Sequence, residues 1–133
     1  MSAYGKFLAA TLPGIIGITL NDGCKISNGN HGYLCYGPFI KLAPGKYCAG
    51  FRVKALQPLQ PENGITLDVS RRGDQIFARR NVPGDELLLG LAGFIALNFE
   101  IDEHVEDIEI RLLLAPGADI MVKDLVVFRS DML

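Results

Sequence analysis

The segment that decides the fold runs from Tyr33 to Ala55 and reads YLCYGPFIKLAPGKYCAGFRVKA. Two apolar-rich arms flank a Pro44-Gly45 pair, which favours a turn because proline presets its own φ and glycine accepts a positive φ. The segment therefore predicts a β-hairpin. In the second arm, odd-numbered apolar residues from Tyr47 to Ala55 alternate with Cys48, Gly50, Arg52 and Lys54. This period is typical of a strand with one buried and one solvated face.

Length and charge limit the function classes. A chain of 133 residues, 49% of them hydrophobic, is long enough for a single domain with a proper core and too short for two, so we expect one domain over residues 1–133. The formal net charge is −2, and the only dense basic positions are Arg71, Arg72, Arg79 and Arg80. We therefore expect neither nucleic acid nor a membrane as partner.

The cysteine pattern indicates a reducing compartment. The three cysteines, Cys24, Cys35 and Cys48, cannot all pair within one chain, and their spacing fits neither a Cys-x-x-Cys metal site nor a disulfide framework. We expect buried thiols that act as small apolar side chains. This predicts a cytoplasmic protein.

The apolar run from Phe7 to Leu20 has two interpretations. Only Lys6 precedes it as a positive residue, Pro13 and Gly14 interrupt it, and Asn21-Asp22-Gly23 follows it in place of a small-x-small cleavage site. Its length also falls short of the roughly 20 residues that span a bilayer. We expect a buried first strand over residues 14–20, with export as the alternative.

The remaining pattern predicts further strands and no substantial helix. Residues 64–70 and 75–80 alternate on either side of a turn at Arg71-Arg72-Gly73-Asp74, which indicates a second hairpin. The tract Leu87–Phe99 contains two glycines and several β-favouring residues, so we expect two strands or one bent strand. Two more strands are expected in residues 108–114 and 120–128. Eight or nine such strands indicate an all-β fold, and we predict a two-sheet antiparallel β-sandwich, a jelly roll.

Two motifs resemble a known family. The first is Gly-x-Leu-x-Tyr-Gly-Pro-Phe at positions 32–39 followed by Leu42-x-Pro-Gly-x-Tyr47, and the second is an acidic loop followed by Asp107-Ile-Glu-Ile-Arg111 and a strand that ends at Phe128. Together they resemble the galactose-binding-like, carbohydrate-binding-module-like β-sandwich domains of bacterial glycan-related proteins. This resemblance implies a jelly roll with a sugar-binding surface. We expect the module to stand without an attached enzyme, and the chain contains no tryptophan.

The candidate ligand-binding residues fall in two groups. Tyr33, Tyr36, Phe39 and His31 would line an aromatic groove near the loop at residues 28–32, unless the aromatic rings belong to the core and His31 is solvated. The second group consists of polar residues that alternate with the core residues along their strands and would form one sheet face. These residues are Arg52, Lys54, Asp68, Ser70, Arg72, Glu109 and Arg111. The alternative for this face is a set of solvated ion pairs. The predicted ligand-binding residues are His31, Tyr33, Tyr36, Arg52, Asp68 and Arg111.

The sequence gives little support for a metal or for catalysis. The acidic loop Glu100–Asp107 lacks an Asp-x-Asp-x-Asp-Gly arrangement, so we predict no metal, although calcium is an alternative. We also predict no cofactor. Nucleophile, phosphate-loop and zinc-protease motifs are absent, and Asp68 with Glu109 would only imitate a glycosidase carboxylate pair. We therefore expect a protein that is not an enzyme.

Two functional hypotheses follow. The first is a non-catalytic carbohydrate-binding-like module that binds a glycan or glycoconjugate and is accessory to polysaccharide synthesis or modification. The second is a self-associating structural or accessory protein with no small-molecule ligand, because the apolar Leu87–Phe99 tract would be covered by a second copy. In both cases we expect a homo-oligomer.

Overall fold

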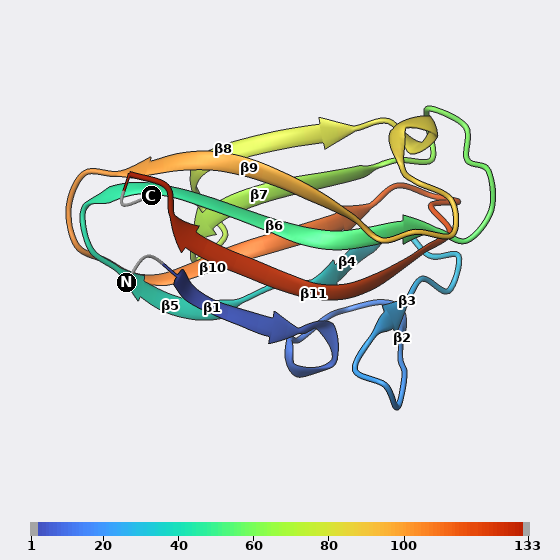
Figure 1. The fold of residues 1–133 in the computed structure, drawn as a ribbon, viewed down its shortest axis with the longest axis horizontal. Helices are drawn as coiled ribbons and strands as arrows, with labels where there is room; N and C mark the ends of the chain where they lie inside the picture. The colour runs from blue at the N-terminus through green and yellow to red at the C-terminus, as the bar shows by residue number, and fades with distance from the viewer. Residues whose placement is uncertain (1–2, 132–133) are drawn as a thin grey trace.

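The structure, a computed structural model that describes residues 3–131, is a sandwich of two antiparallel sheets (Figure 1). Sheet A contains β1 (Ala3–Leu8), β2 (Ile18–Thr19), β3 (Lys25–Ile26), β6 (Gly45–Ala55), β9 (Gly93–Ile101) and β11 (Ile120–Arg129). Sheet B contains β4 (Gly32–Cys35), β5 (Pro38–Leu42), β7 (Ile65–Arg71), β8 (Gln75–Val82) and β10 (Val105–Leu114). The predicted all-β sandwich is confirmed, with two strands of only two residues each, β2 and β3, among its eleven described strands.

Each sheet is built around two long central strands. In sheet A the order is β2-β3-β11-β6-β9, and β1 also pairs with β11. In sheet B the order is β4-β10-β7-β8, and β5 continues the β4 edge along β10. Two short 3₁₀ turns, η1 (Ala9–Thr11) and η2 (Gly84–Glu86), are the helical segments of the described chain. Neither is long and apolar enough to cross a membrane.

The core lies between the sheets and follows the predicted alternation. Tyr47, Ala49 and Phe51 are fully buried, and Val53 is 1% exposed. Strand β10 contributes its alternate residues from the facing sheet, because Ile108, Ile110, Leu112 and Leu114 have no exposed surface. Burial of this apolar surface is the main favourable term for the fold.

The predicted hairpin around Pro44-Gly45 is wrong. β5 pairs with β10 in sheet B, whereas β6 pairs with β9 and β11 in sheet A. The Pro-Gly pair therefore takes the chain from one sheet to the other. Local turn chemistry is the same for a hairpin and for such a crossing, so the sequence pattern alone did not separate them. By contrast, the predicted hairpin of β7 and β8 is confirmed.

The predicted buried strand over residues 14–20 is also wrong. Only Ile18 and Thr19 form a strand, both are exposed, and Ile15 is 72% exposed. The first strand is instead β1, which pairs with β11 and includes the first two residues of the apolar run, Phe7 and Leu8. Loop residues 12–17 lie against β4, where Ile15 donates its amide N–H to the Tyr33 carbonyl at 2.9 Å.

The Leu87–Phe99 tract divides into a loop and a strand. β9 begins at Gly93 and runs antiparallel to β6, as expected for the β-favouring half of the tract. Leu88, Leu89 and Leu91 precede it and are 49%, 58% and 67% exposed. The tract therefore leaves a cluster of leucine side chains in solvent at one end of the sandwich.

Cys24, Cys35 and Cys48 are free thiols. Burial raises the pKa of the Cys35 thiol to about 11, so this side chain is a poor nucleophile at neutral pH. It behaves as a small apolar core residue.

Candidate functional site

A pocket of about 200 Å³ lies on the outer face of sheet B. Sheet B provides residues from β4 and β10, the turn between β7 and β8 closes one side, and the loop before β2 closes another. The lining residues are Ile15, Tyr33, Tyr36, Arg72, Gly73, Glu109 and Arg111. Three of the six predicted ligand-binding residues, Tyr33, Tyr36 and Arg111, therefore meet in one place.

Strand register brings Tyr33 and Arg111 together. Tyr33 pairs with Leu113, two residues along β10 from Arg111. The Arg111 guanidinium carbon lies 4.8 Å from the centre of the Tyr33 ring. This is the geometry of a cation–π contact, and it fixes the aromatic face beside the pocket.

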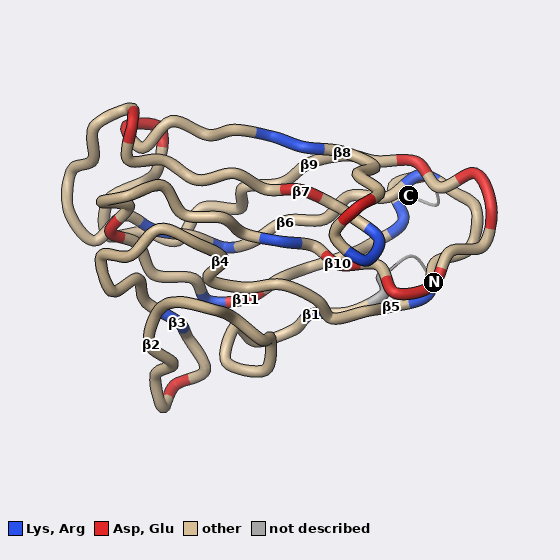
Figure 2. The backbone as a smooth tube through the Cα atoms, turned by 180° about the vertical axis from the view of Figure 1, so that it is seen from behind, with Lys and Arg blue, Asp and Glu red and all other residues tan. Residues whose placement is uncertain are grey.

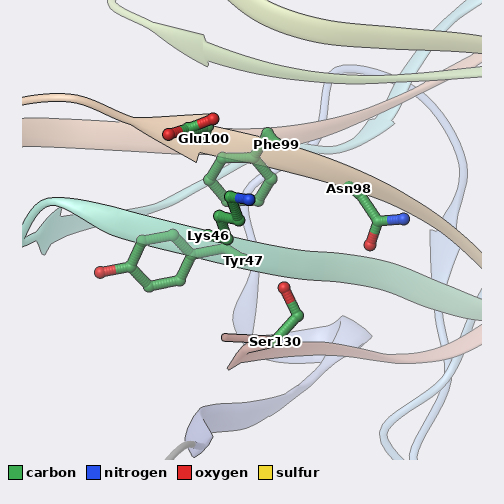
Figure 3. A pocket seen from close by; sticks show the side chains of 6 residues that line it. All are labelled: Lys46, Tyr47, Asn98, Phe99, Glu100 and Ser130. Carbon is green, nitrogen blue, oxygen red and sulfur yellow. The ribbon is translucent and has the colours of Figure 1, made fainter. Parts of the chain in front are cut away.

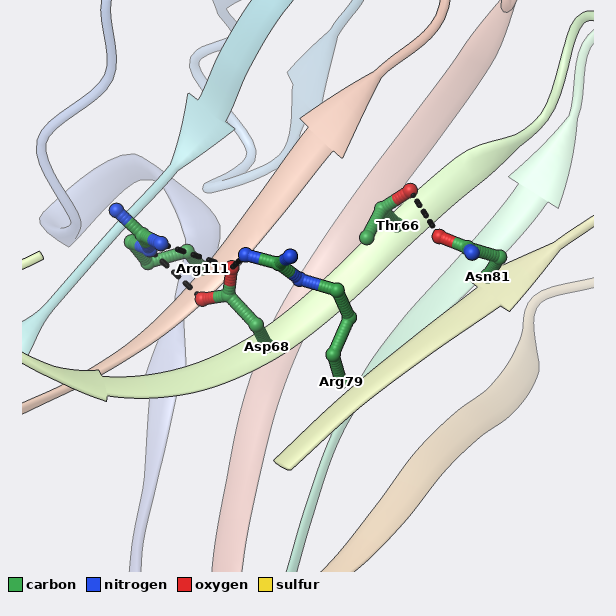
Figure 4. Close-up of polar contacts among 5 residues, drawn as sticks. All are labelled: Thr66, Asp68, Arg79, Asn81 and Arg111. Atoms are coloured by element: carbon green, nitrogen blue, oxygen red, sulfur yellow. Dashed lines mark hydrogen bonds and ion pairs between the residues drawn. The ribbon is translucent and has the colours of Figure 1, made fainter. Parts of the chain in front are cut away.

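Asp68 holds Arg111 in place by a bidentate ion pair. Arg111 Nε and Nη2 donate to the two Asp68 carboxylate oxygens at 2.7 and 2.8 Å, and Arg79 Nη2 approaches Asp68 Oδ2 at 3.4 Å (Figure 4). Asp68 is 3% exposed and does not line the pocket. The bidentate pair makes Asp68 a positioning residue for Arg111.

Arg111, Asp68 and Arg79 form part of a row of polar side chains, the polar row, that crosses the outer face of sheet B. Figure 2 shows Lys or Arg on β8 and β10 with Asp or Glu on β7 between them. Further along β7, the Thr66 hydroxyl donates to the Asn81 side-chain oxygen at 2.8 Å (Figure 4). The outer face of sheet B therefore extends as a polar surface from the pocket towards β8.

Aromatic surface extends in the other direction. The Tyr36 and Phe39 rings are 6.2 Å apart at an interplanar angle of 83°, which is an edge-to-face contact. Phe39 is 49% exposed. The interpretation that placed both rings in the core is therefore wrong for Phe39, and the site has an exposed aromatic side chain beside Tyr36.

Backbone strain is concentrated around this pocket. In the described part of the chain, three residues other than glycine have positive φ: Phe39 at 68°, Arg72 at 56° and Asp107 at 60°. Phe39 packs on Tyr36, Arg72 lines the pocket, and Asp107 pairs with Arg72 at 3.3 Å. Side chains disfavour this conformation, and such strain clusters at functional sites.

Glu109 is the carboxylate of the pocket that lacks a partner. It is 8% exposed, and no described residue forms an ion pair or a side-chain hydrogen bond with it. Burial raises the pKa of the Glu109 carboxyl, while Arg111 lowers it and Asp68 and Asp107 raise it further. Ser70, which pairs with Glu109 across β7 and β10, has a buried hydroxyl that also lacks a partner among the described residues.

The remaining predicted residues do not enter the pocket. Arg52 lies on sheet A, where its Nε donates to Asp124 at 2.7 Å and its Nη2 donates to the second oxygen. The predicted single polar face is therefore wrong, because Arg52 and Asp68 belong to different sheets. His31 is exposed in the loop before β4 and is not among the lining residues.

Sequence reasoning left Glu109, Arg72 and Ile15 out of the predicted ligand-binding set. Strand parity already placed Glu109 and Arg72 outside the core, so the signal for them existed and only their proximity to Tyr33 was missing. Ile15 had no such signal, because its apolar run is typical of a buried strand.

A second pocket, of about 460 Å³, lies on sheet A near the end of β11 (Figure 3). It is lined by Lys46, Tyr47, Asn98, Phe99, Glu100 and Ser130. Its two aromatic rings stack on each other at 5.4 Å, and Tyr47 and Phe99 are 0% and 6% exposed. Because these rings belong to the core, they offer little aromatic surface to a ligand.

A glycosidase-like pair of free carboxylates and a metal-binding cluster are not formed by residues 3–131. Both Asp68 oxygens accept hydrogen bonds from Arg111, so Asp68 does not form a free carboxylate pair with Glu109. No group of three or more His, Cys, Asp or Glu residues in the described chain is placed to hold a metal ion.

Several solved structures with a similar fold are carbohydrate-binding modules. The CBM6 module of lichenase 5A from Cellvibrio mixtus, solved with cellotriose, is 11% identical with a TM-score of 0.62, and the match covers 96% of this chain and 98% of that one. The second N-terminal cellulose-binding domain of β-1,4-glucanase C from Cellulomonas fimi is 12% identical with a TM-score of 0.63, over 96% and 92% of the two chains. The C-terminal CBM6 of a Zobellia galactanivorans laminarinase is 12% identical with a TM-score of 0.60, over 94% and 98%.

At these identities the matches establish the fold alone. They confirm the resemblance to a carbohydrate-binding-module-like β-sandwich. No protein-family model matches the sequence, and no curated protein does.

Proposed function

We propose that this protein is a non-catalytic glycan-binding module that holds a sugar ring in the pocket on sheet B. One observation carries the proposal. Two half-buried tyrosine rings and an arginine fixed by a buried carboxylate line one pocket together with Arg72, a non-glycine residue with positive φ. The fold shared with carbohydrate-binding modules supports the same function.

The chemistry of the pocket suits a sugar. A pyranose ring has an apolar face of C–H groups, which packs on aromatic side chains such as Tyr33 and Tyr36. Its hydroxyls both donate and accept hydrogen bonds, which suits the Glu109 carboxylate and the unpartnered donors of Arg111. A volume of about 200 Å³ accommodates one ring, with the rest of an oligosaccharide lying along the polar row towards β8.

Calorimetric titration with soluble glucan and xylan oligosaccharides tests the proposal. We expect saturable binding that Tyr36→Ala weakens by at least about tenfold, because a central aromatic contact is lost. Phe94→Ala is the matched control, since Phe94 is an aromatic residue that is 45% exposed on sheet A. Loss of binding in the control variant, or no change in Tyr36→Ala, would place the ligand elsewhere.

The accessory role and the location are parts of the same proposal. The matched modules come from a lichenase, a glucanase and a laminarinase, which supports a role in holding a glycan for an enzyme of polysaccharide synthesis or modification. Three free thiols support a reducing, cytoplasmic compartment. Microscopy of the tagged protein in its native host tests the location.

Self-association is a second candidate function. Leu88, Leu89 and Leu91 are exposed together in the loop before β9, and Leu56 and Phe94 are 42% and 45% exposed. Exposed apolar side chains of this size favour contact with another protein surface. We expect light scattering to detect a dimer that Leu89→Glu dissociates. A monomer at all concentrations would remove this candidate.

A further inference from the structure

The cationic side chains of the sheet B pocket are already neutralised. Arg111 uses Nε and Nη2 on Asp68, and Arg72 Nε and Nη2 both lie 3.3 Å from Asp107 Oδ2. Asp68 also accepts from Arg79. A ligand carboxylate would therefore have to compete with an existing carboxylate at each arginine.

The anionic group of the same pocket, the Glu109 carboxylate, is not neutralised by an ion pair within the described chain. Glu109 lines the pocket with 8% of its surface exposed and has no ion pair or side-chain hydrogen bond with any residue in 3–131. Among the charges that act on the pKa of the Glu109 carboxyl, Arg111 lowers it, whereas Asp68 and Asp107 raise it. The Glu109 carboxylate faces the pocket and has no partner in the described chain, so it is available to accept a hydrogen bond from a ligand.

These observations distinguish between classes of sugar. An ammonium group would form a charge-assisted hydrogen bond with Glu109, a hydroxyl would form an ordinary one, and a uronate carboxylate would meet a like charge. We propose that the pocket selects an amino sugar with a free ammonium group over neutral sugars and rejects uronic acids, with Glu109 as the receiving group. This inference rests on the proposed glycan-binding function.

The pocket geometry is consistent with one such ring. Tyr33 and Tyr36 form an aromatic wall, and Ile15 from the preceding loop adds an apolar contact. The Ser70 hydroxyl, opposite Glu109 in the strand pairing, is buried and does not line the pocket. The ammonium group would thus approach Glu109 beside an aromatic surface.

Calorimetric titration with three β-1,4-linked hexasaccharides tests the selectivity. Each charged hexamer differs from glucose hexamer at one position, with an amine at C2 in glucosamine or a carboxylate at C6 in glucuronic acid, and at pH 6 most of the amines are protonated. We expect glucosamine hexamer to bind about tenfold more tightly than glucose hexamer, because a charged hydrogen bond replaces a neutral one. Glucuronic acid hexamer should bind more weakly than both.

Two variants test whether Glu109 causes the preference for glucosamine hexamer over glucose hexamer. Glu109→Gln should bring the glucosamine and glucose hexamers within about twofold of each other. Glu103→Gln is the matched control, because it removes the same charge from an exposed position in the β9–β10 loop. It should leave the preference intact. Circular dichroism and thermal unfolding verify that both variants fold.

The possible failures are distinguishable. If Glu109→Gln keeps the preference, or Glu103→Gln loses it equally, then Glu109 is not the receiving group and the inference is overturned. If the wild-type protein binds glucose hexamer as tightly as glucosamine hexamer, the inference fails while the glycan-binding function stands. If neither hexamer nor any other oligosaccharide binds, both fail.

Discussion

At the scale of single residues, two carboxylates in opposite situations dominate the electrostatics. Asp124 is fully buried on sheet A and bound by both arms of the Arg52 guanidinium, with Lys6 3.7 Å away. Glu109 is nearly as buried on sheet B but has no such partner in the described chain. The first carboxylate stabilises the fold, whereas the second is retained at a cost in stability.

Asp124→Asn should destabilise the protein by about 2 kcal/mol, because it leaves Arg52 without a charged partner and Arg52 keeps some solvent contact. Urea unfolding measures this value. Glu106→Gln is the control, since the exposed Lys41–Glu106 pair at 3.9 Å should contribute less than about 0.5 kcal/mol. Equal effects of the two substitutions would contradict the assigned role of Asp124.

The Asp124 pair also predicts a pH dependence. The hydrogen bond from Arg52 is the largest cause that lowers the pKa of the Asp124 carboxyl. Stability from this pair is therefore fully present above the unfolded-state pKa of about 4 and is lost as pH falls through the lower folded-state pKa. The stability difference between wild type and Asp124→Asn should shrink below about pH 4.

Glu109 predicts a pH dependence of stability with the opposite sign to that of Asp124. Burial raises the pKa of its carboxyl, so the folded state is favoured below the unfolded-state pKa of about 4.3 and loses stability as pH rises through the folded-state pKa. Glu109→Gln should therefore raise the melting temperature by a few degrees at pH 7 and have little effect near pH 4. A lower melting temperature at pH 7 would indicate a structural role for the carboxylate.

At the scale of elements, the central strand β6 tolerates little side-chain volume on its outer face. A Cβ atom at Gly50 would lie 2.5 Å from the Ile95 carbonyl oxygen and 2.7 Å from the Ala96 Cα. Both atoms belong to the neighbouring strand β9. The glycine therefore permits the close approach of two strand backbones.

Gly50→Ala should destabilise the protein by about 2–3 kcal/mol, because the clash is with backbone atoms that cannot move aside easily. Gly29→Ala is the control. Gly29 has a φ of 87° and nothing within 4 Å of an added Cβ, so only backbone strain of about 1 kcal/mol is expected. Chemical denaturation of both variants compares the two mechanisms, and a smaller loss for Gly50→Ala would contradict the close β6–β9 approach.

Alternation was the reliable guide to the elements. It correctly placed Phe51 and Val53 in the core and identified β7, β8, β10 and β11, because a strand with one dry face leaves a period of two in the sequence. It did not assign strands to sheets. The Pro44-Gly45 turn looks the same whether β6 folds back on β5 or crosses to sheet A, and only the long-range pairing with β9 and β11 decides.

The alternation along the strands also made part of the site predictable. Parity placed Asp68, Glu109 and Arg111 on an outer face, and the neighbouring strands β7 and β10 bring them together. Arg52 has the same parity on β6 and was therefore grouped with them, although it lies on the opposite sheet. Parity reports which side of a strand a residue occupies but not which sheet the strand joins.

At the scale of the whole molecule, the two outer faces of the sandwich differ in character. The face of sheet B presents paired charges, partly exposed aromatic rings and Glu109, which has no ion pair with any residue in 3–131, around one pocket. The face of sheet A is close-packed near its centre around Gly50 and carries the Arg52–Asp124 pair. We therefore place the proposed glycan binding on sheet B, and the pocket on sheet A near Lys46 and Ser130 is the competing site.

Backbone amide chemical shifts, recorded by NMR while an oligosaccharide is added, test the central claim most directly. Binding at the proposed site should shift the amides of Tyr33, Tyr36, Gly73 and Arg111 in a saturable way and leave those of β6 and β9 unchanged. Shifts that cluster instead at Lys46, Asn98 and Ser130, or no saturable shift with any oligosaccharide, would contradict the assignment of glycan binding to the outer face of sheet B.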